Sequence, residues 1–167
     1  VVNFIASDPY AFPAKFIMDE FPDTVVKGLR ILKRLYPQAR LNVTIPRNYR
    51  HQFLVMLKQH GYHEETTIHL LSNKYPQEHD AVLLNTLFGK HIPPNKSSIN
   101  IGIVIVNAYD LIPIVEAVFT GKPLIERMVY VSGSWCVNEG IYRARIGTSS
   151  AAFMSCKKKC AIRIFSN

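Results

Sequence analysis

The sequence predicts an α/β fold, with a Rossmann-like parallel sheet covered by helices on both faces over residues 1–125 and a small β-grasp unit over residues 126–167. Two observations support this prediction. Up to about residue 125, short apolar runs rich in β-branched residues alternate with segments whose apolar residues recur at helical spacing. Beyond that point short strands and turns replace this alternation, so the architecture changes there.

The first strand is expected at residues 1–6, an apolar run that suits a strand buried in a parallel sheet. A helix follows, because the next apolar residues fall on one helical face and the basic residues on another. Asp23 or Thr24 is expected to cap this helix, and Pro37 to end it.

Two further strand and helix pairs are expected in the middle of the chain. Residues 41–45 alternate as a strand does, and Asn48 opens a helix that ends at Gly61. Residues 66–71 predict a third strand, and residues 77–88 predict the helix after it.

A fourth strand is expected at residues 101–106, which are rich in β-branched side chains and should lie deep in the sheet. Residues 108–119 predict the last helix of this layer, in which Pro113 is tolerated because it falls near the first turn. Strands and helices that alternate at these lengths imply right-handed βαβ units and a parallel sheet.

The segment after residue 126 is organised differently. Strands are expected at residues 128–131, 141–146 and 161–165, with a short helix at residues 148–158. Two strands, a helix and a strand within about 40 residues fit a small β-grasp unit.

Composition limits the classes of function. The 167 residues are 48% hydrophobic and 19% charged, which is typical of a globular protein. No apolar run approaches the roughly 20 residues of a transmembrane helix, so no direct membrane span is expected. The net charge of +8 raises the possibility of nucleic-acid binding, but the densest basic run, residues 157–159, is short. A solvated or partner-facing basic surface explains the charge better, so nucleic-acid binding is not expected.

Three stretches together resemble a known family. They are Lys74-Tyr75-Pro76-Gln77, the run from Gly121 to Gly133, and the run from Gly140 to Thr148. With them the chain resembles RnfC, the peripheral subunit of the Rnf-type electron transport complex, and its relatives NqrA and the flavin-binding subunit of respiratory complex I. The resemblance implies a Rossmann-like flavin/NADH domain followed by a β-grasp domain of the SLBB type.

The resemblance also implies a cofactor site at the end of the first strand. Asn3 and Asp8 form the pattern Asn-x-x-x-x-Asp-Pro, where the resembled family has Asn followed by Glu-Pro in a segment that lines the flavin and nicotinamide site. Asn3 would donate a hydrogen bond to the flavin, and Asp8 would replace the Glu. A second acid of the family corresponds to Ala6 in this chain. The alternative is a strand-end turn in which Asp8 forms an Asx turn.

Lys74 and Tyr75 are the weaker candidates for cofactor contacts, because they belong to the Lys-Tyr-Pro-Gln segment that matches the family. A Gly commonly follows this segment in RnfC, whereas this chain has Glu78, whose negative charge at a helix start disfavours a phosphate. The sequence also contains no Gly-rich loop of the kind that cradles a phosphate. The resemblance implies FMN and NADH as cofactors, with the Gly-rich loop upstream of Val1.

No metal site is expected in this chain. Cys156 and Cys160 are spaced Cys-x-x-x-Cys, and Cys136 lies far from them, whereas a zinc or cluster site needs about four ligands, typically in Cys-x-x-Cys pairs. In the resembled family the iron–sulfur cysteines lie further downstream.

Two hypotheses about function follow. In the first, the chain is a portion of an RnfC/NqrA-like subunit of a membrane-associated redox complex, which transfers electrons between NADH, flavin and ferredoxin or quinone. That hypothesis implies the other subunits as partners and a cytoplasmic location, peripheral to the inner membrane. In the second, the fold survives as a non-catalytic scaffold that docks an acidic protein partner through Arg143 and Arg145.

Overall fold

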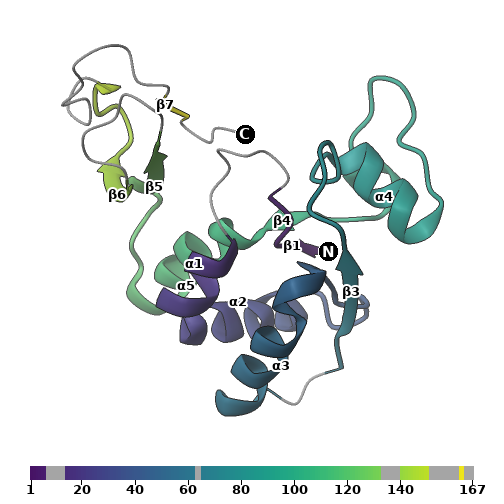
Figure 1. Cartoon of the computed structure of the whole chain (residues 1–167), viewed down its shortest axis with the longest axis horizontal. Coiled ribbons are helices and arrows are strands. Elements are labelled where there is room, and N and C mark those ends of the chain that lie inside the picture. Colours follow the sequence, from purple (N-terminus) through teal and green to yellow (C-terminus); the bar gives the residue numbers. More distant parts are fainter. Residues whose placement is uncertain (7–13, 63–64, 133–139, 151–161, 164–167) are drawn as a thin grey trace.

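The structure is a computed structural model that describes residues 1–6, 14–62, 65–132, 140–150 and 162–163. Four parallel strands form the larger sheet in the order β3-β2-β1-β4 (Figure 1): β1 (Val2–Asn3), β2 (Asn42–Pro46), β3 (Thr67–Leu71) and β4 (Val106–Asn107). The smaller sheet is antiparallel, in the order β6-β5-β7: β5 (Glu126–Val131), β6 (Gly140–Arg145) and β7 (Ile162–Arg163). The predicted α/β fold with a Rossmann-like sheet is confirmed.

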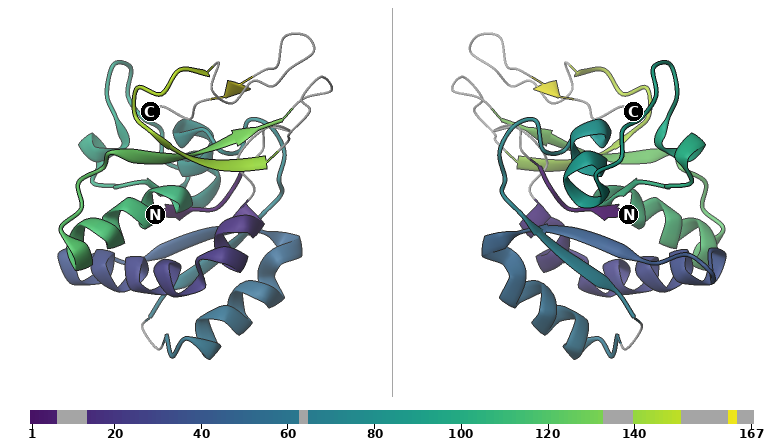
Figure 2. Two further views of the ribbon diagram at one scale, coloured as in Figure 1. Left: turned by 90° about the vertical axis from the view of Figure 1, so that its left-hand side faces the viewer. Right: turned by 90° about the vertical axis from the view of Figure 1, so that its right-hand side faces the viewer.

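Helices lie on both faces of the parallel sheet (Figures 1 and 2). On one face the ring of Phe4, just after β1, packs edge-on against Phe53 of α3 with 5.4 Å between centroids. On the other face the ring of Phe88, at the end of α4, meets His69 of β3 at 6.2 Å. In the part of the chain that the structure describes, the α-helices are α1 (Ala14–Glu20), α2 (Pro22–Leu35), α3 (Arg50–Gln59), α4 (Asp80–Phe88) and α5 (Leu111–Thr120).

The start of the first long helix differs from the prediction. It begins at Pro22, with a separate helix α1 before it, and Phe21 takes the N-cap position without a side-chain cap bond. Proline fits the first helical position because its missing N–H has no partner there and its fixed φ suits the helix. The predicted caps are therefore wrong, and Asp23 lies in the first turn instead.

The expected strand at residues 101–106 is also wrong in most of its length. A 3₁₀ helix, η2 (Ser98–Ile101), covers its start, and Gly102 has a φ of 76°. Only Val106 and Asn107 pair with β1, at the edge of the sheet. A positive φ interrupts an extended strand, so the segment does not lie deep in the sheet, and Val104 is 39% exposed.

The other described elements lie close to their predicted positions. Gly89 ends α4 with a φ of 63°, in the left-handed conformation expected of a helix C-cap. β5 and β6 form where two strands were predicted and pair with each other, and β7 adds to the other side of β5. Most of the helix predicted at residues 148–158 falls outside the described residues. The β-grasp assignment and the domain boundary at residue 125 therefore stay predictions.

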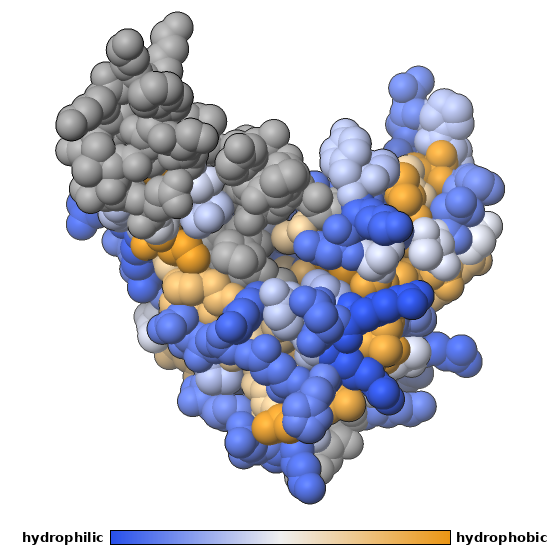
Figure 3. Space-filling view, in the orientation of Figure 1, coloured by the Kyte–Doolittle hydropathy of each residue, from blue (hydrophilic) through white to orange (hydrophobic). Residues whose placement is uncertain are grey.

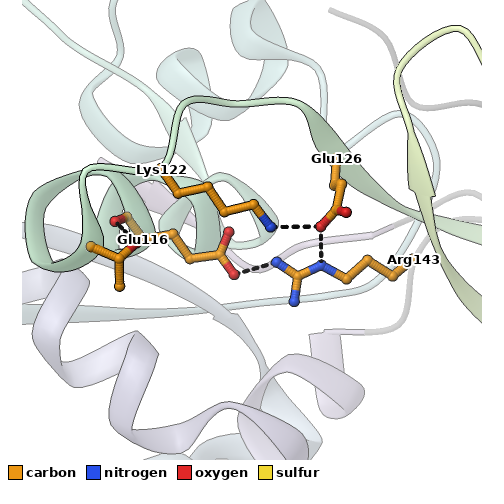
Figure 4. Close-up of polar contacts among 5 residues, drawn as sticks. Glu116, Lys122, Glu126 and Arg143 are labelled. Carbon is orange, nitrogen blue, oxygen red and sulfur yellow. Dashed lines mark hydrogen bonds and ion pairs between the residues drawn. The ribbon is translucent and has the colours of Figure 1, made fainter.

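An ion-pair network joins the antiparallel sheet to α5 (Figure 4). The guanidinium of Arg143 on β6 pairs with Glu116 on α5 and, through Nε, with Glu126 on β5 at 2.8 Å. Lys122, after α5, also binds Glu126 at 2.7 Å. The hydrogen bond from Lys122 lowers the pKa of Glu126, and the positive charge of Arg143 acts in the same direction. Glu126 therefore stays ionised, and the ion pairs of Glu126 and Glu116 with Arg143 hold the base of the small sheet beside the last helix.

Hydrophilic residues cover much of the coloured surface in Figure 3, with apolar areas between them. Single exposed apolar side chains are normal on a globular protein. None of the helices in the described residues has the length and apolar character needed to cross a bilayer.

Gly28 allows α2 and α5 to approach each other closely. A Cβ at this position would lie 3.0 Å from Cδ2 and 3.1 Å from Cβ of Leu111. We expect Gly28→Val to cost about 1–3 kcal/mol of the free energy of unfolding, because the two helices must move apart. Urea denaturation measures this cost.

Arg34→Val is the matched control, because Arg34 is exposed on the same helix and accepts a β-branched residue without a steric clash. Adding Leu111→Ala to Gly28→Val should cost less than the sum of the two single substitutions, since the smaller side chain makes room for the valine. Equal costs for Gly28→Val and Arg34→Val would show that the helix contact does not limit side-chain size.

Candidate functional site

One face of the parallel sheet carries a row of polar side chains. The register aligns His69 of β3, Thr44 of β2, Asn3 of β1 and Asn107 of β4, so the four share one face. Asn42 lies on the same face, and its Oδ1 is 2.9 Å from Nε2 of His69. Burial lowers the pKa of His69, which favours its neutral form. Because parallel strands are usually apolar on both faces, this polar row makes the face the candidate for a binding site.

Asn3 is the most buried member of this row that lies at a strand end, with 3% of its surface exposed. Its Oδ1 accepts two hydrogen bonds, one from the backbone N–H of Ile5 at 3.0 Å and one from Oγ1 of Thr44 at 2.8 Å. Among the residues that the structure describes, none accepts a hydrogen bond from Nδ2 of Asn3. Buried amides are normally bonded at both ends, so Nδ2 is left for an acceptor that is not among these residues.

The loop after β3 meets the end of β1 at this edge of the sheet. The backbone N–H of Ala6 donates to Oδ1 of Asn73 at 3.2 Å. Lys74 and Tyr75 come directly after Asn73 and are exposed, Tyr75 to 70%. The structure thus brings the Lys74 and Tyr75 segment to the same edge as Asn3, as the ends of parallel strands require. Neither side chain is buried.

The loop after β4 completes this edge, and the pKa values of two of its side chains are shifted. Burial raises the pKa of Tyr109, and the negative charges of Asp110 and Glu78 raise it further, while Arg127 and a hydrogen bond with Asn107 lower it. Burial also raises the pKa of Asp110, although Arg127 lies 3.4 Å away and opposes the shift. Acidic and basic groups therefore face each other around Tyr109, where their charges offset one another.

Two cavities lie near this sheet. One of about 40 Å³ is bordered by Tyr109, Asp110 and Arg127, and it has room for a water molecule only. The other, of about 620 Å³, lies at the opposite edge, where the strands begin, and its lining includes Leu41 and Val104. Asn3, Lys74 and Tyr75 do not line the larger cavity, so it is separate from the candidate site.

Four residues considered as ligands or cofactor contacts lie outside the described residues, namely Asp8, Cys136, Cys156 and Cys160. The role of Asp8 therefore stays a prediction. Within the described ranges no group of three or more His, Cys, Asp or Glu side chains is arranged to hold a metal ion.

Comparison with known proteins identifies the family. A family model described as the Nuo51 FMN-binding domain matches residues 1–116, which is well over half of the chain. The chain belongs to the Nuo51 FMN-binding domain family. The matched region contains all four strands of the parallel sheet and the whole polar row, so the family match and the candidate site coincide.

Individual proteins show a second similarity. The C subunit of the ion-translocating oxidoreductase complex of Yersinia pestis is 28% identical over 148 residues, which are 89% of this chain and 24% of that protein. Its counterpart in Yersinia pseudotuberculosis is 31% identical over 150 residues, with 89% and 21% covered, and that in Haemophilus influenzae is 26% identical over 155 residues, with 93% and 24% covered. The resemblance to RnfC is confirmed. The chain spans less than a quarter of the length of these relatives.

Sequence reasoning missed Thr44, the side chain that holds Asn3 in this Nuo51-type domain. Thr44 is fully buried, and its hydroxyl is the only side-chain donor to Asn3 among the described residues. A signal for it was present, since Asn42 and Thr44 alternate with apolar residues in a strand that a doubly covered parallel sheet would normally make apolar throughout. His69 repeats the signal in the next strand.

Removing the carboxamide of Asn3 should destabilise the fold even without a ligand. Asn3→Ala deprives two buried donors, the N–H of Ile5 and the hydroxyl of Thr44, of their acceptor. We expect a loss of about 1–3 kcal/mol in the free energy of unfolding, measured by urea denaturation.

The control removes the second partner as well. In the double variant Asn3→Ala with Thr44→Val, the hydroxyl no longer needs an acceptor, so the combined cost should be smaller than the sum of the single costs. Strict additivity would mean that the bond between Thr44 and Asn3 contributes nothing to folding.

Proposed function

We propose that this chain forms part of the flavin-binding region of an RnfC-like subunit in an ion-translocating oxidoreductase complex, and that the carboxyl edge of its parallel sheet contacts FMN. One observation carries the proposal: the buried Asn3 has both lone pairs of its carbonyl engaged within the chain while its amide donor has no acceptor among the described residues. This donor lies at the sheet edge where open α/β folds bind ligands. The family description and the relatives' name point to the same cofactor and complex.

The residues of the chain would act by binding and orientation. Nδ2 of Asn3 would donate to an acceptor atom of the flavin ring, and Asp8 would contribute a carboxylate beside it. Lys74 and Tyr75 are exposed on the adjacent loop and would form an outer layer of contacts. When bound, the flavin would supply the redox chemistry, and the protein would position it and tune its potential.

The phosphate of FMN would be held by another part of the full-length protein. The chain contains no Gly-rich loop, and Glu78 and Asp110 add negative charge near the carboxyl edge. We further propose NADH as the electron donor, ferredoxin or quinone as the acceptor, a β-grasp unit of the SLBB type after residue 125, and a cytoplasmic position peripheral to the inner membrane. The other subunits of the complex would be the partners.

A scaffold without cofactor is the second candidate. The negative charges of Glu78 and Asp110 favour this candidate, because they oppose the binding of an anionic ligand at the carboxyl edge. The predicted docking through Arg143 and Arg145 is weakened, since the Arg143 guanidinium already pairs with Glu116 and Glu126 of its own chain. Arg145 remains exposed at the end of β6.

The proposal is tested by titrating the full-length protein with FMN and following flavin fluorescence. We expect saturable binding, and Asp8→Ala should weaken it about tenfold, because a lost hydrogen bond to a charged group is worth at least that factor.

Glu65→Ala is the matched control, since Glu65 is an exposed acid just before β3, at the opposite edge of the sheet. It should leave FMN affinity unchanged. A protein that purifies without flavin and ignores both FMN and NADH in titration would support the scaffold instead.

A further inference from the structure

We infer that Thr44 is a positioning residue for the flavin site: together with the backbone N–H of Ile5, its hydroxyl fixes the carboxamide of Asn3 so that a donor faces the ligand. This inference deepens the proposed function and rests on it. The relevant distances are 2.8 Å from Oγ1 of Thr44 to Oδ1 of Asn3 and 3.0 Å from N of Ile5 to the same oxygen.

The backbone N–H of Ile5 determines which end of the carboxamide points inward. A backbone N–H can only donate, so the atom that faces it must be the carbonyl oxygen of Asn3 and not the NH₂ group. A flipped carboxamide would place two donors against each other in a buried position, where an unmade bond is strongly destabilising. The assignment of Oδ1 and Nδ2 therefore follows from the hydrogen-bond pattern.

The hydroxyl of Thr44 fixes the remaining freedom of Asn3. With one hydrogen bond, the terminal torsion of an Asn side chain is broad, so the NH₂ group could sweep through a range of directions. A second donor that reaches the same oxygen from β2 restricts that rotation. Thr44 is itself held, because it is 0% exposed, β-branched and paired in register with Asn3 on the neighbouring strand.

The consequence is a specificity for the ligand atom at this point. The site presents the NH₂ donor of Asn3 and excludes its carbonyl, so the ligand must offer a hydrogen-bond acceptor, such as a carbonyl oxygen or an unprotonated ring nitrogen. An acceptor that takes up no proton on reduction, such as a conjugated carbonyl oxygen, gains negative charge when the ligand accepts electrons. A fixed donor therefore stabilises the reduced ligand more than the oxidised one and raises its reduction potential.

The test compares Thr44→Val with Thr44→Ser in the full-length protein, with FMN as the probe. Valine keeps the shape of threonine and removes the hydroxyl, whereas serine keeps the hydroxyl. We expect Thr44→Val to raise the Kd for FMN about fivefold, the factor that corresponds to one hydrogen bond, and to shift the potential of bound FMN to a more negative value. Thr44→Ser should restore most of the FMN affinity and most of the reduction potential of the wild type.

Thr66→Val is the matched control for a lost hydroxyl. Thr66 shares a 2.8 Å hydrogen bond with the hydroxyl of Tyr62, at the other end of the sheet. Thr66→Val should lower the free energy of unfolding without changing the reduction potential of bound FMN. A ligand-free measurement supports the comparison: in protein labelled with ¹⁵N-Asn, the NH₂ signals of Asn3 should be sharp in the wild type and Thr44→Ser and broadened in Thr44→Val.

The outcomes separate the two claims. If the wild type binds FMN and Thr44→Val binds it with the same affinity and the same reduction potential, the role of Thr44 is overturned and the proposed function stays intact. Sharp NH₂ signals of Asn3 in Thr44→Val would also overturn it, because the carboxamide would then be fixed without the hydroxyl. A wild-type protein that does not bind FMN would overturn the proposed function and, with it, the ligand role of Thr44.

Discussion

The parallel pairing of β1 with β2 is the constraint on which the rest of the structure depends. It places Val2 beside Val43 and Asn3 beside Thr44, so adjacent positions on the same two strands serve opposite faces of the sheet. The valines enter the core with α2 and α3, and the polar pair lies on the other face. A slip of one residue would exchange these faces, burying the amide in the apolar core and placing a valine at the edge proposed to contact the ligand. Fold and site are therefore set by one register.

This dependence explains why so short a strand as β1 is so well buried. Val2 and Phe4 are each 1% exposed, and the edge-to-face packing of Phe4 on Phe53 secures the chain just beyond the strand. With only two ladder residues on each side, β1 is held as much by these side chains as by its hydrogen bonds. The apolar contacts thus fix the position of Asn3, which lies between the two.

The elements were predictable where a local pattern and the tertiary environment agree. Residues 41–45 alternate, Gly89 caps a helix, and Pro113 falls in the first turn of α5; each of these follows from a rule that involves only neighbours in the sequence. Residues 101–106 were not predictable in this way, because their β-branched side chains favour a strand while the positive φ of Gly102 and the place of β4 at the sheet edge prevent one. Propensity is a weaker term than strand pairing.

The candidate site also contains one part that the sequence indicated and one part that it did not. Asn3 and the Lys74 and Tyr75 segment were proposed from their match to the family pattern, and the structure places both at the carboxyl edge of the sheet, while their contact with a cofactor stays a prediction. The hydrogen bond between Asn3 and Thr44 joins residues 41 positions apart, so no local pattern reports it. The alternation of polar residues in β2 indicates only that one face is polar.

The charged side chains that pair within the chain lie mainly at the small sheet. The basic residues behind the net charge of +8 are scattered along the sequence, and two basic side chains of the small sheet, Arg127 and Arg143, pair with Asp110, Glu116 and Glu126. These pairs lie where the last helix meets β5 and β6, so they act on the attachment of the small sheet more than on the ligand edge. Exposed ion pairs contribute little to stability individually, but several that share carboxylates restrict orientation. In the proposed site the uncharged donor of Asn3 would suit ligand recognition better than these charges, since its direction is set by two hydrogen bonds and does not depend on screening by salt.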